Sequence, residues 1–205
     1  MKIMRWVGLI VLVGLAYVGW RYYQIQSAAV RWEGPVKEIL SEKFDKQANT
    51  THMEYTSRID APVEEVFRAF QRPEDMQKYT EVIRSAKLLE SEDNRKVIEV
   101  EAVILGQPQQ MTLDFTFLPQ EHRILMKGDS SLAAVEGEYR LTPSPDGTKT
   151  LLTYTATSED KVNLPMPVGT QKSAARELFA STIRALNKGL AAQSAGGESA
   201  TAQPQ

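Results

Sequence analysis

The chain of 205 residues is long enough for one domain of ordinary size with further segments at its ends. Charged residues make up 24% of it, and the net charge is −2 with both signs interspersed, so it lacks the basic surface typical of nucleic-acid binding. The absence of cysteine excludes disulfides and thiolate metal sites. His52 and His122 both lie in polar sequence, which favours solvated loop histidines. We therefore predict no metal and no cofactor.

An uncharged, almost wholly apolar run extends from Trp6 to Trp20, with basic residues on both sides. Extended at its ends, it is long enough to cross a hydrocarbon core of about 30 Å. We predict an uncleaved, single-pass anchor over residues 1–26 in a cytoplasmic membrane. A cleaved secretory signal is the alternative, because small residues follow the run. In either case Lys2 and Arg5 favour an N-terminus inside the cell, with the remaining chain on the periplasmic or extracellular side.

Residues 27–52 form the predicted linker between this run and the domain. Val36, Ile39, Leu40 and Phe44 have helical spacing among charged residues, so we predict a short amphipathic helix. Its apolar side is expected to rest on the domain or on lipid headgroups. The domain is favoured because the basic residues of the linker are balanced by acids.

The predicted domain, residues 53–190, opens with a strand and two short helices. Alternation from Met53 to Ile59 predicts a strand with one covered face. A helix follows with Pro62 in its first turn, and Pro73 ends that helix and begins the second. The apolar residues of the first helix have the spacing of a core-facing stripe: Val63, Val66, Phe67 and Phe70.

Six segments of strand character come next, separated by turn residues. They are about Val82 to Glu90, Lys96 to Leu105, Gln109 to Leu118, Arg123 to Lys127, Ala134 to Thr142 and Lys149 to Thr157. Because the breaks between them are short, neighbouring strands are expected to be antiparallel. With the opening strand, the sequence predicts a seven-stranded antiparallel meander. The face that carries Glu99 and Glu101 is predicted to be a solvated convex surface with cross-strand arginine partners.

The last predicted helix runs from about Pro167 to Leu190, and its apolar stripe must lie on the sheet. The stripe consists of Val168, Ala175, Leu178, Phe179, Thr182, Ile183, Leu186 and Leu190. The opposite side is predicted to be exposed and carries Ser173, Arg176, Glu177, Ser181, Arg184 and Lys188. Residues 191–205 are small and polar without an apolar pattern, and we predict a disordered tail.

This order of elements resembles the START-like, helix-grip superfamily, also called SRPBCC. The stretch SRIDAPVEEVFRAFQRPEDMQKYTEVIRSAKLLE is similar to the opening of its polyketide cyclase/dehydrase and coenzyme Q-binding branches. The matching positions are Ala61, Pro62, Val66, Phe67, Asp75 and Tyr79. The resemblance covers residues 53–190 and implies an α+β helix-grip fold, in which a curved sheet grips the final helix and encloses a cavity for lipids, sterols, quinones or polyketides.

Patterns typical of catalysis do not occur: there is no Ser–His–Asp order, Cys–His pair, phosphate-binding glycine loop or metalloprotease helix. The carboxylate pairs Glu64/Glu65 and Glu99/Glu101 favour structural roles. The predicted site is a hydrophobic pocket, with a tyrosine hydroxyl to orient the ligand. Its candidate lining residues are Phe67, Phe70, Tyr79, Met111, Leu113, Phe115, Phe117, Tyr139, Tyr154, Leu178 and Phe179, each of which would also suit a plain packed core.

Three hypotheses follow. The first is non-enzymatic binding or carriage of a hydrophobic small molecule, such as a lipid, isoprenoid or quinone, by a domain held at the membrane. The second is an enzyme of the cyclase or aromatase kind, using Tyr79, Tyr139 or Tyr154. The third is an envelope scaffold with a filled core. The predicted partners are an apolar ligand and the membrane, without nucleic acid, and the sequence does not predict an oligomeric state.

Overall fold

The computed structural model describes residues 32–33, 37–78, 82–104, 106–162 and 166–199. The chain divides into two compact units, Met1–Val36 and Lys37–Gln205, and the second holds the folded domain. The predicted anchor, residues 1–26, lies outside the described residues. Among the helices that are described, none is long and apolar enough to span a bilayer.

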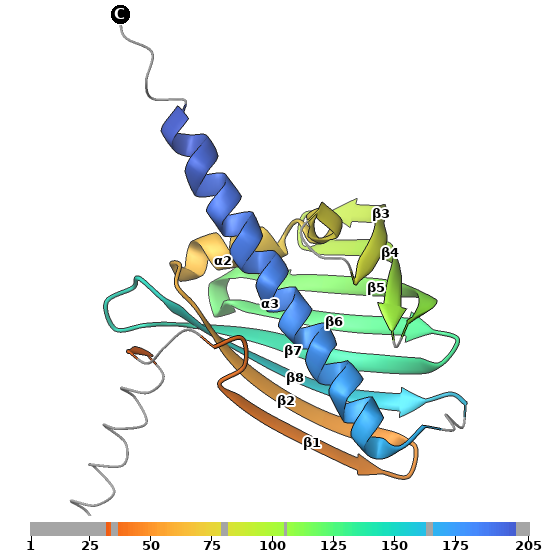
Figure 1. Cartoon of the computed structure of the whole chain (residues 1–205). Helices are drawn as coiled ribbons and strands as arrows, with labels where there is room; N and C mark the ends of the chain where they lie inside the picture. Colours follow the sequence, from red (N-terminus) through yellow and green to blue (C-terminus); the bar gives the residue numbers. More distant parts are fainter. Residues whose placement is uncertain (1–31, 34–36, 79–81, 105, 163–165, 200–205) are drawn as a thin grey trace, which may run out of the picture. The chain divides into compact units, whose positions relative to one another are not determined.

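Eight antiparallel strands form one curved sheet in the order β1-β2-β8-β7-β6-β5-β4-β3 (Figure 1). Their bounds are β1 Ser41–Gln47, β2 Thr50–Ile59, β3 Ile83–Glu92, β4 Arg95–Ile104, β5 Gln107–Leu118, β6 Arg123–Ser130, β7 Ala133–Pro143 and β8 Thr150–Asp160. The predicted meander is confirmed from β3 to β8. The chain crosses the sheet once between β2 and β3, where the two short helices lie.

The prediction of seven strands was one too few, because β1 lies where an amphipathic helix was expected. β1 pairs antiparallel with β2, with Phe44 opposite Met53. Its inward positions are Glu42, Phe44 and Lys46, so only one of three is apolar and the alternation cannot be seen in the sequence. β1 and β2 are joined by the two-residue turn Ala48–Asn49, where Ala48 has a φ of 52°, and the backbone hydrogen bonds of this hairpin with the edge of β2 decide the conformation.

The helices are α2 Val63–Phe70, the 3-10 helices η1 Pro73–Lys78 and η2 Pro119–Glu121, and α3 Val168–Ser199. Pro62 precedes α2 rather than lying within it, and its carbonyl accepts the N–H groups of Glu65 and Val66. α3 passes the predicted end at Leu190 and continues to Ser199, so the described part of the expected disordered tail is helical. Alanine and glutamine have high helix propensity, and a helix that is already nucleated propagates readily.

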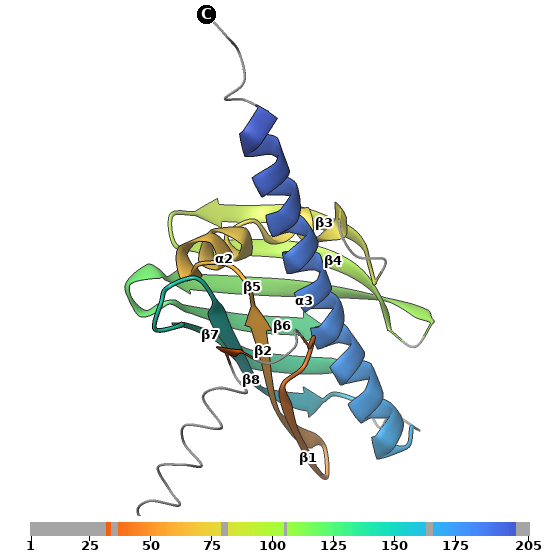
Figure 2. The same cartoon turned by 60° about the vertical axis from the view of Figure 1, so that its left-hand side comes forward.

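α3 lies across the concave face of the sheet, with α2 near its C-terminal half (Figures 1 and 2). Its buried stripe is confirmed at Phe179, Ile183, Leu186 and Leu190, which are 8% exposed or less. The stripe was wrong at Val168, in the first turn of α3, and at Leu178, which are 52% and 37% exposed.

One residue predicted on the exposed side of α3 is buried: Ser181 is 2% exposed and donates its hydroxyl to the carbonyl of Leu178. The segment before β1 runs beside α3, as the 2.8 Å ion pair between Glu38 and Arg184 shows. The helix is therefore covered along its flank as well as by the sheet, as the 4% exposure of Ala180 confirms. The spacing of apolar residues predicts only one buried side of a helix, so it could not predict that a second side is also buried.

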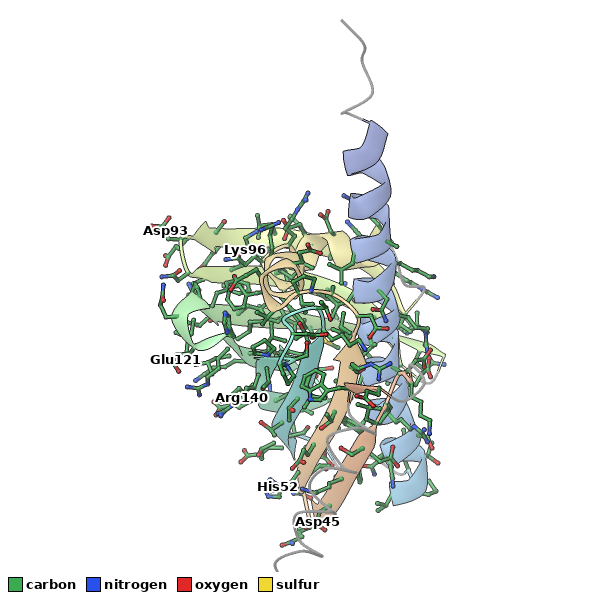
Figure 3. All side chains as sticks on the ribbon, turned by 90° about the vertical axis from the view of Figure 1, so that its left-hand side faces the viewer. Asp45, His52, Asp93, Lys96, Glu121 and Arg140 are labelled. Carbon is green, nitrogen blue, oxygen red and sulfur yellow. The ribbon has the colours of Figure 1, made fainter. Side chains whose placement is uncertain are left out.

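The convex face carries the predicted charges and their arginine partners. Arg95 bonds Asp114 at 2.9 Å, Arg123 bonds Glu138 at 2.7 Å, and Arg84 lies 3.5 Å from Glu101. The hydrogen bond from Arg123 is the main cause of a lowered pKa of Glu138. Figure 3 shows Arg140 and Glu121 on the side of the sheet away from α3.

Candidate functional site

Apolar side chains cover the concave face in rows that cross the strands. Paired residues of antiparallel strands point to the same face, so the strand register fixes each row. The central row holds Phe117 of β5, Ile124 of β6, Tyr139 of β7, Tyr154 of β8 and Tyr55 of β2. α3 lies over this row.

Rings from five elements form a continuous aromatic ladder beneath α3. Phe179 of α3 stacks on Tyr55 with ring centroids 5.0 Å apart and lies 6.1 Å from Tyr154. Tyr154 stacks on Tyr139 at 4.6 Å, and Tyr139 meets Phe70 of α2 at 4.9 Å. Such pairs contribute about 0.5–1.5 kcal/mol each beyond their burial. Four predicted lining residues are therefore brought together here, joined by Tyr55.

Another group of rings closes the end of the concave face nearest α2. Phe67 meets Phe117 edge to face at 6.3 Å, and Phe115 stacks on Phe117 at the same distance. All three side chains are 5% exposed or less. At this end Lys96 of β4, which is labelled in Figure 3, also pairs with Glu74 of η1 at 3.4 Å. We call this region the sealed end.

The opposite end, at the beginning of β5 and of α3, is only partly covered. Met111, Leu113, Val135 and Ala175 pack against the core but remain half-buried. Gly128 of β6 lies between Leu113 of β5 and Val135 of β7. A Cβ atom at Gly128 would stand 3.1 Å from Leu113 Cδ2, so the glycine leaves room for the leucine side chain. We call this apolar surface the open end.

Two of the predicted lining residues are not placed in the site. Tyr79 lies outside the described residues, and Leu178 is 37% exposed at the edge of α3. The prediction omitted Tyr55, Met53 and Val135, which occupy the same face as the residues it named. The alternation of β2 already predicted that Met53 and Tyr55 lie on its covered face, so the sequence was sufficient to name both as lining residues.

The tyrosines of the ladder are poor bases. Burial raises the pKa of Tyr139, and burial, followed by Tyr139 and Tyr55, raises that of Tyr154. Burial and then Glu42 raise the pKa of Tyr55 to about 12, against a lowering effect of Arg176. All three hydroxyls are therefore protonated at neutral pH and are available as hydrogen-bond donors to a ligand.

The prediction of solvated loop histidines is confirmed in part, because His52 is exposed but lies in a strand, whereas His122 lies in a turn with its side chain 30% exposed. His52 lies within β2 on the convex face, where its Nδ1 is 3.1 Å from Thr157 Oγ1. His122 follows η2 with a positive φ of 48°, and its Nε2 lies 2.9 Å from Glu64 Oε1 of α2. Its ring also meets Phe67, so it links a hairpin turn to α2. In the described part of the chain no His, Asp and Glu cluster is arranged to hold a metal ion.

Residues 50–195 match the family model described as polyketide cyclase/dehydrase and lipid transport. The chain belongs to this family. The match confirms the START-like resemblance and covers the sheet from β2 onward together with most of α3. A comparison with curated proteins found no match.

Solved structures share the family's fold at low sequence identity. The Zhui aromatase/cyclase of a Streptomyces species has a TM-score of 0.61 and 14% identity, over 69% of this chain and 93% of that one. A START superfamily protein from Mycobacterium smegmatis has a TM-score of 0.58 and 18% identity, over 69% and 98%. A STAR-related lipid transfer protein from Xanthomonas axonopodis has a TM-score of 0.54 and 13% identity, over 73% and 98%. At such identities these likenesses show the helix-grip fold alone.

Proposed function

We propose that the domain binds or carries a hydrophobic small molecule, such as a lipid, isoprenoid or quinone, on its concave face without chemical conversion. The observation that carries this proposal is the open end, where Met111, Leu113 and Val135 keep apolar surface accessible beside a packed aromatic ladder. An apolar concave surface with a few polar groups is typical of small-molecule sites. The family, described by both cyclase/dehydrase and lipid transport, supports the ligand class.

The absence of conversion is proposed from the chemistry of the ladder. Tyr139 and Tyr154 have raised pKa values, and among the described residues no histidine or carboxylate hydrogen-bonds to either hydroxyl. A general base needs a pKa near the working pH and contact with the proton that it removes. These hydroxyls suit the orientation of a ligand carbonyl or hydroxyl instead.

Native mass spectrometry of the full chain, purified in detergent from a membrane extract, tests the proposal. We expect additional mass that releases a lipid-like compound. Leu113→Arg places a charge on the open end and should abolish the bound mass. Leu125→Arg is the matched control, because Leu125 is 36% exposed on the convex face of the neighbouring strand. Empty wild-type protein from every extract, or equal loading of the two variants, would contradict the proposal.

A second candidate function is cyclase or aromatase chemistry. The stacked tyrosines Tyr139 and Tyr154, 4.6 Å apart, favour it because they place two phenol donors beside the open end. The test is turnover of a poly-β-ketone analogue by the wild-type chain and by the Tyr139→Phe/Tyr154→Phe variant. Turnover that the double variant loses, while still retaining lipid, would favour the enzyme over the carrier.

We also propose that residues 1–26 hold the domain at the outer side of a cytoplasmic membrane. The apolar run and its flanking basic residues support this proposal. Deletion of residues 1–26 should move the protein into the soluble fraction with its cooperative unfolding transition intact, because the strands and helices that the structure describes for the domain begin at Ser41. Loss of that transition, or a deletion variant that still sediments with membranes, would contradict the assignment.

A further inference from the structure

A hollow of about 610 Å³ lies on the flank of α3, away from the concave face. It is lined by Lys37, Glu38, Ile39, Ser173, Arg176, Glu177 and Ala180. The four α3 residues follow one another at helical spacing and occupy a different side of the helix from Phe179 and Ile183. The hollow therefore opens between α3 and the segment before β1, separate from the open end, and we call it the flank hollow.

The two acidic residues of the flank hollow, Glu38 and Glu177, share one cation. Arg184 pairs with Glu38 at 2.8 Å and also binds Glu177. A single arginine fork thus holds both carboxylates at one side of the hollow.

The basic residues at the flank hollow outnumber the carboxylates that pair with them. Lys172 Nζ and Arg176 Nε share one carboxylate, lying 3.0 Å from Glu42 Oε1 and 3.4 Å from its Oε2. Lys37 is exposed and has no ionic partner among the described residues. Around the flank hollow, four cations (Lys37, Lys172, Arg176 and Arg184) therefore face three carboxylates (Glu38, Glu42 and Glu177), which leaves an excess of one positive charge.

Arg176 is placed to receive an oxyanion. Its Nε faces Glu42, and within the described part of the chain its two terminal nitrogens make no hydrogen bond. The guanidinium fork binds phosphate oxygens in pairs, which a lysine ammonium cannot do. The hollow is also within the size range of ordinary ligand sites, so an esterified phosphate has room in it.

We propose that the flank hollow binds a phosphate group, held by Arg176 and Lys37, as a second site distinct from the apolar-ligand site. Its chemistry suits either the headgroup of an anionic phospholipid or free phosphate. The observations that support it are Lys37 without an ionic partner, the free terminal nitrogens of Arg176, the excess of one positive charge and the hollow itself.

The test uses the full chain in a maltoside detergent at low ionic strength. Calorimetric titrations are made with inorganic phosphate and with dihexanoyl phosphatidylglycerol. We expect binding of at least one probe, and a loss of about tenfold in affinity for Arg176→Gln and for Lys37→Gln, the size of one charge-assisted hydrogen bond. Lys127→Gln is the matched control, because it removes the same charge from the convex face, where the side chain is 73% exposed.

Each outcome has a defined meaning. Binding of both probes identifies a phosphate site, binding of the lipid alone identifies a headgroup site, and both support the proposal. Failure of both probes to bind, or unchanged affinity in Arg176→Gln and Lys37→Gln, would overturn it. Lys37→Gln removes no hydrogen bond or ion pair within the described residues, so it should fold as the wild-type chain does, and thermal melts of all variants check this.

Discussion

The two ends of the concave face use the same kinds of side chain to different effect. At the sealed end Phe67 of α2 packs on Phe117 of β5, Phe115 stacks on the same ring, and all three side chains are 5% exposed or less. At the open end Met111 and Leu113 of the same strand β5 remain half-buried. Because apolar residues at both ends lie on the same face of β5, coverage rather than composition separates packed core from accessible surface. Substitutions at the sealed end should therefore lower stability, whereas substitutions at the open end should lower ligand retention.

The largest effect is expected at the sealed end, from Phe117→Ala. Phe117 is 2% exposed and contacts two other rings, so truncation leaves a cavity that its neighbours cannot fill. The loss in unfolding free energy should be about 3–5 kcal/mol. Denaturant melts measure it, and lipid retention by the folded fraction should not change. A loss below about 2 kcal/mol would show that this end is not closed as described.

Next comes Gly137→Ala, which tests the ladder between the two ends. A Cβ atom at Gly137 would lie 2.9 Å from Tyr154 Cε2 and 3.1 Å from the carbonyl oxygen of Thr155. The ring must move away and the backbone must shift, and such overpacking costs about 1–3 kcal/mol. Gly106→Ala, where nothing lies within 4 Å but φ is +77°, separates a backbone effect from a contact effect. If the two variants lose similar amounts of stability, and the aromatic circular dichroism signal of Gly137→Ala equals that of the wild type, the contact between Gly137 and the ring of Tyr154 would be contradicted.

The sequence predicts the sealed end better than the open end for a physical reason. Alternation along β5 shows that Leu113 and Phe117 share a face, but the coverage of each depends on how far α2 and α3 reach across it. The stripe of α3 likewise identified Ile183 and Leu186 correctly, yet could not show that Leu178 lies beyond the sheet's cover or that Ser181 lies under the chain before β1.

The same limit explains β1 and the flank hollow. β1 forms because β2 has a free edge, and its own residues, mostly charged, carry little sign of it. Lys37 and Arg176 are separated by most of the chain, so their approach follows only after β1 has been placed beside α3. Local patterns identify elements, whereas coverage and edge pairing are properties of the assembled fold.

A smaller stability effect is expected at the open end, from Leu113→Ala. The side chain is half-buried, so its removal exposes little new surface and should cost less than about 2 kcal/mol. Lipid retention should fall markedly, the reverse of the result at Phe117. Denaturant melts and native mass spectrometry of the same preparations measure both quantities. If Leu113→Ala retained as much lipid as the wild type, the proposal that the ligand binds at the open end would be wrong.

The smallest effect, and the one with opposite sign, is expected from Tyr55→Phe, between the two ends at the β1 edge. Tyr55 is 1% exposed, and its hydroxyl has no hydrogen-bond partner among the described residues. Burial of an unpartnered hydroxyl costs about 1–3 kcal/mol, so the phenylalanine variant should be more stable at pH 7, by roughly 1 kcal/mol. A loss of stability at pH 7 would mean that the hydroxyl has a bound partner.

The pH dependence sharpens this test. Burial and then Glu42 raise the pKa of Tyr55 to about 12, above the value near 10 of an unfolded chain. A raised pKa means that the folded chain keeps the proton that the unfolded chain loses, so the contribution is complete below pH 10 and disappears between pH 10 and 12. Wild-type stability should therefore fall more steeply than that of Tyr55→Phe across this range, while Tyr139 and Tyr154 keep part of the slope in both. Equal slopes would show that Tyr55 ionises in the folded chain as readily as in the unfolded one, and so that α3 leaves its hydroxyl open to water.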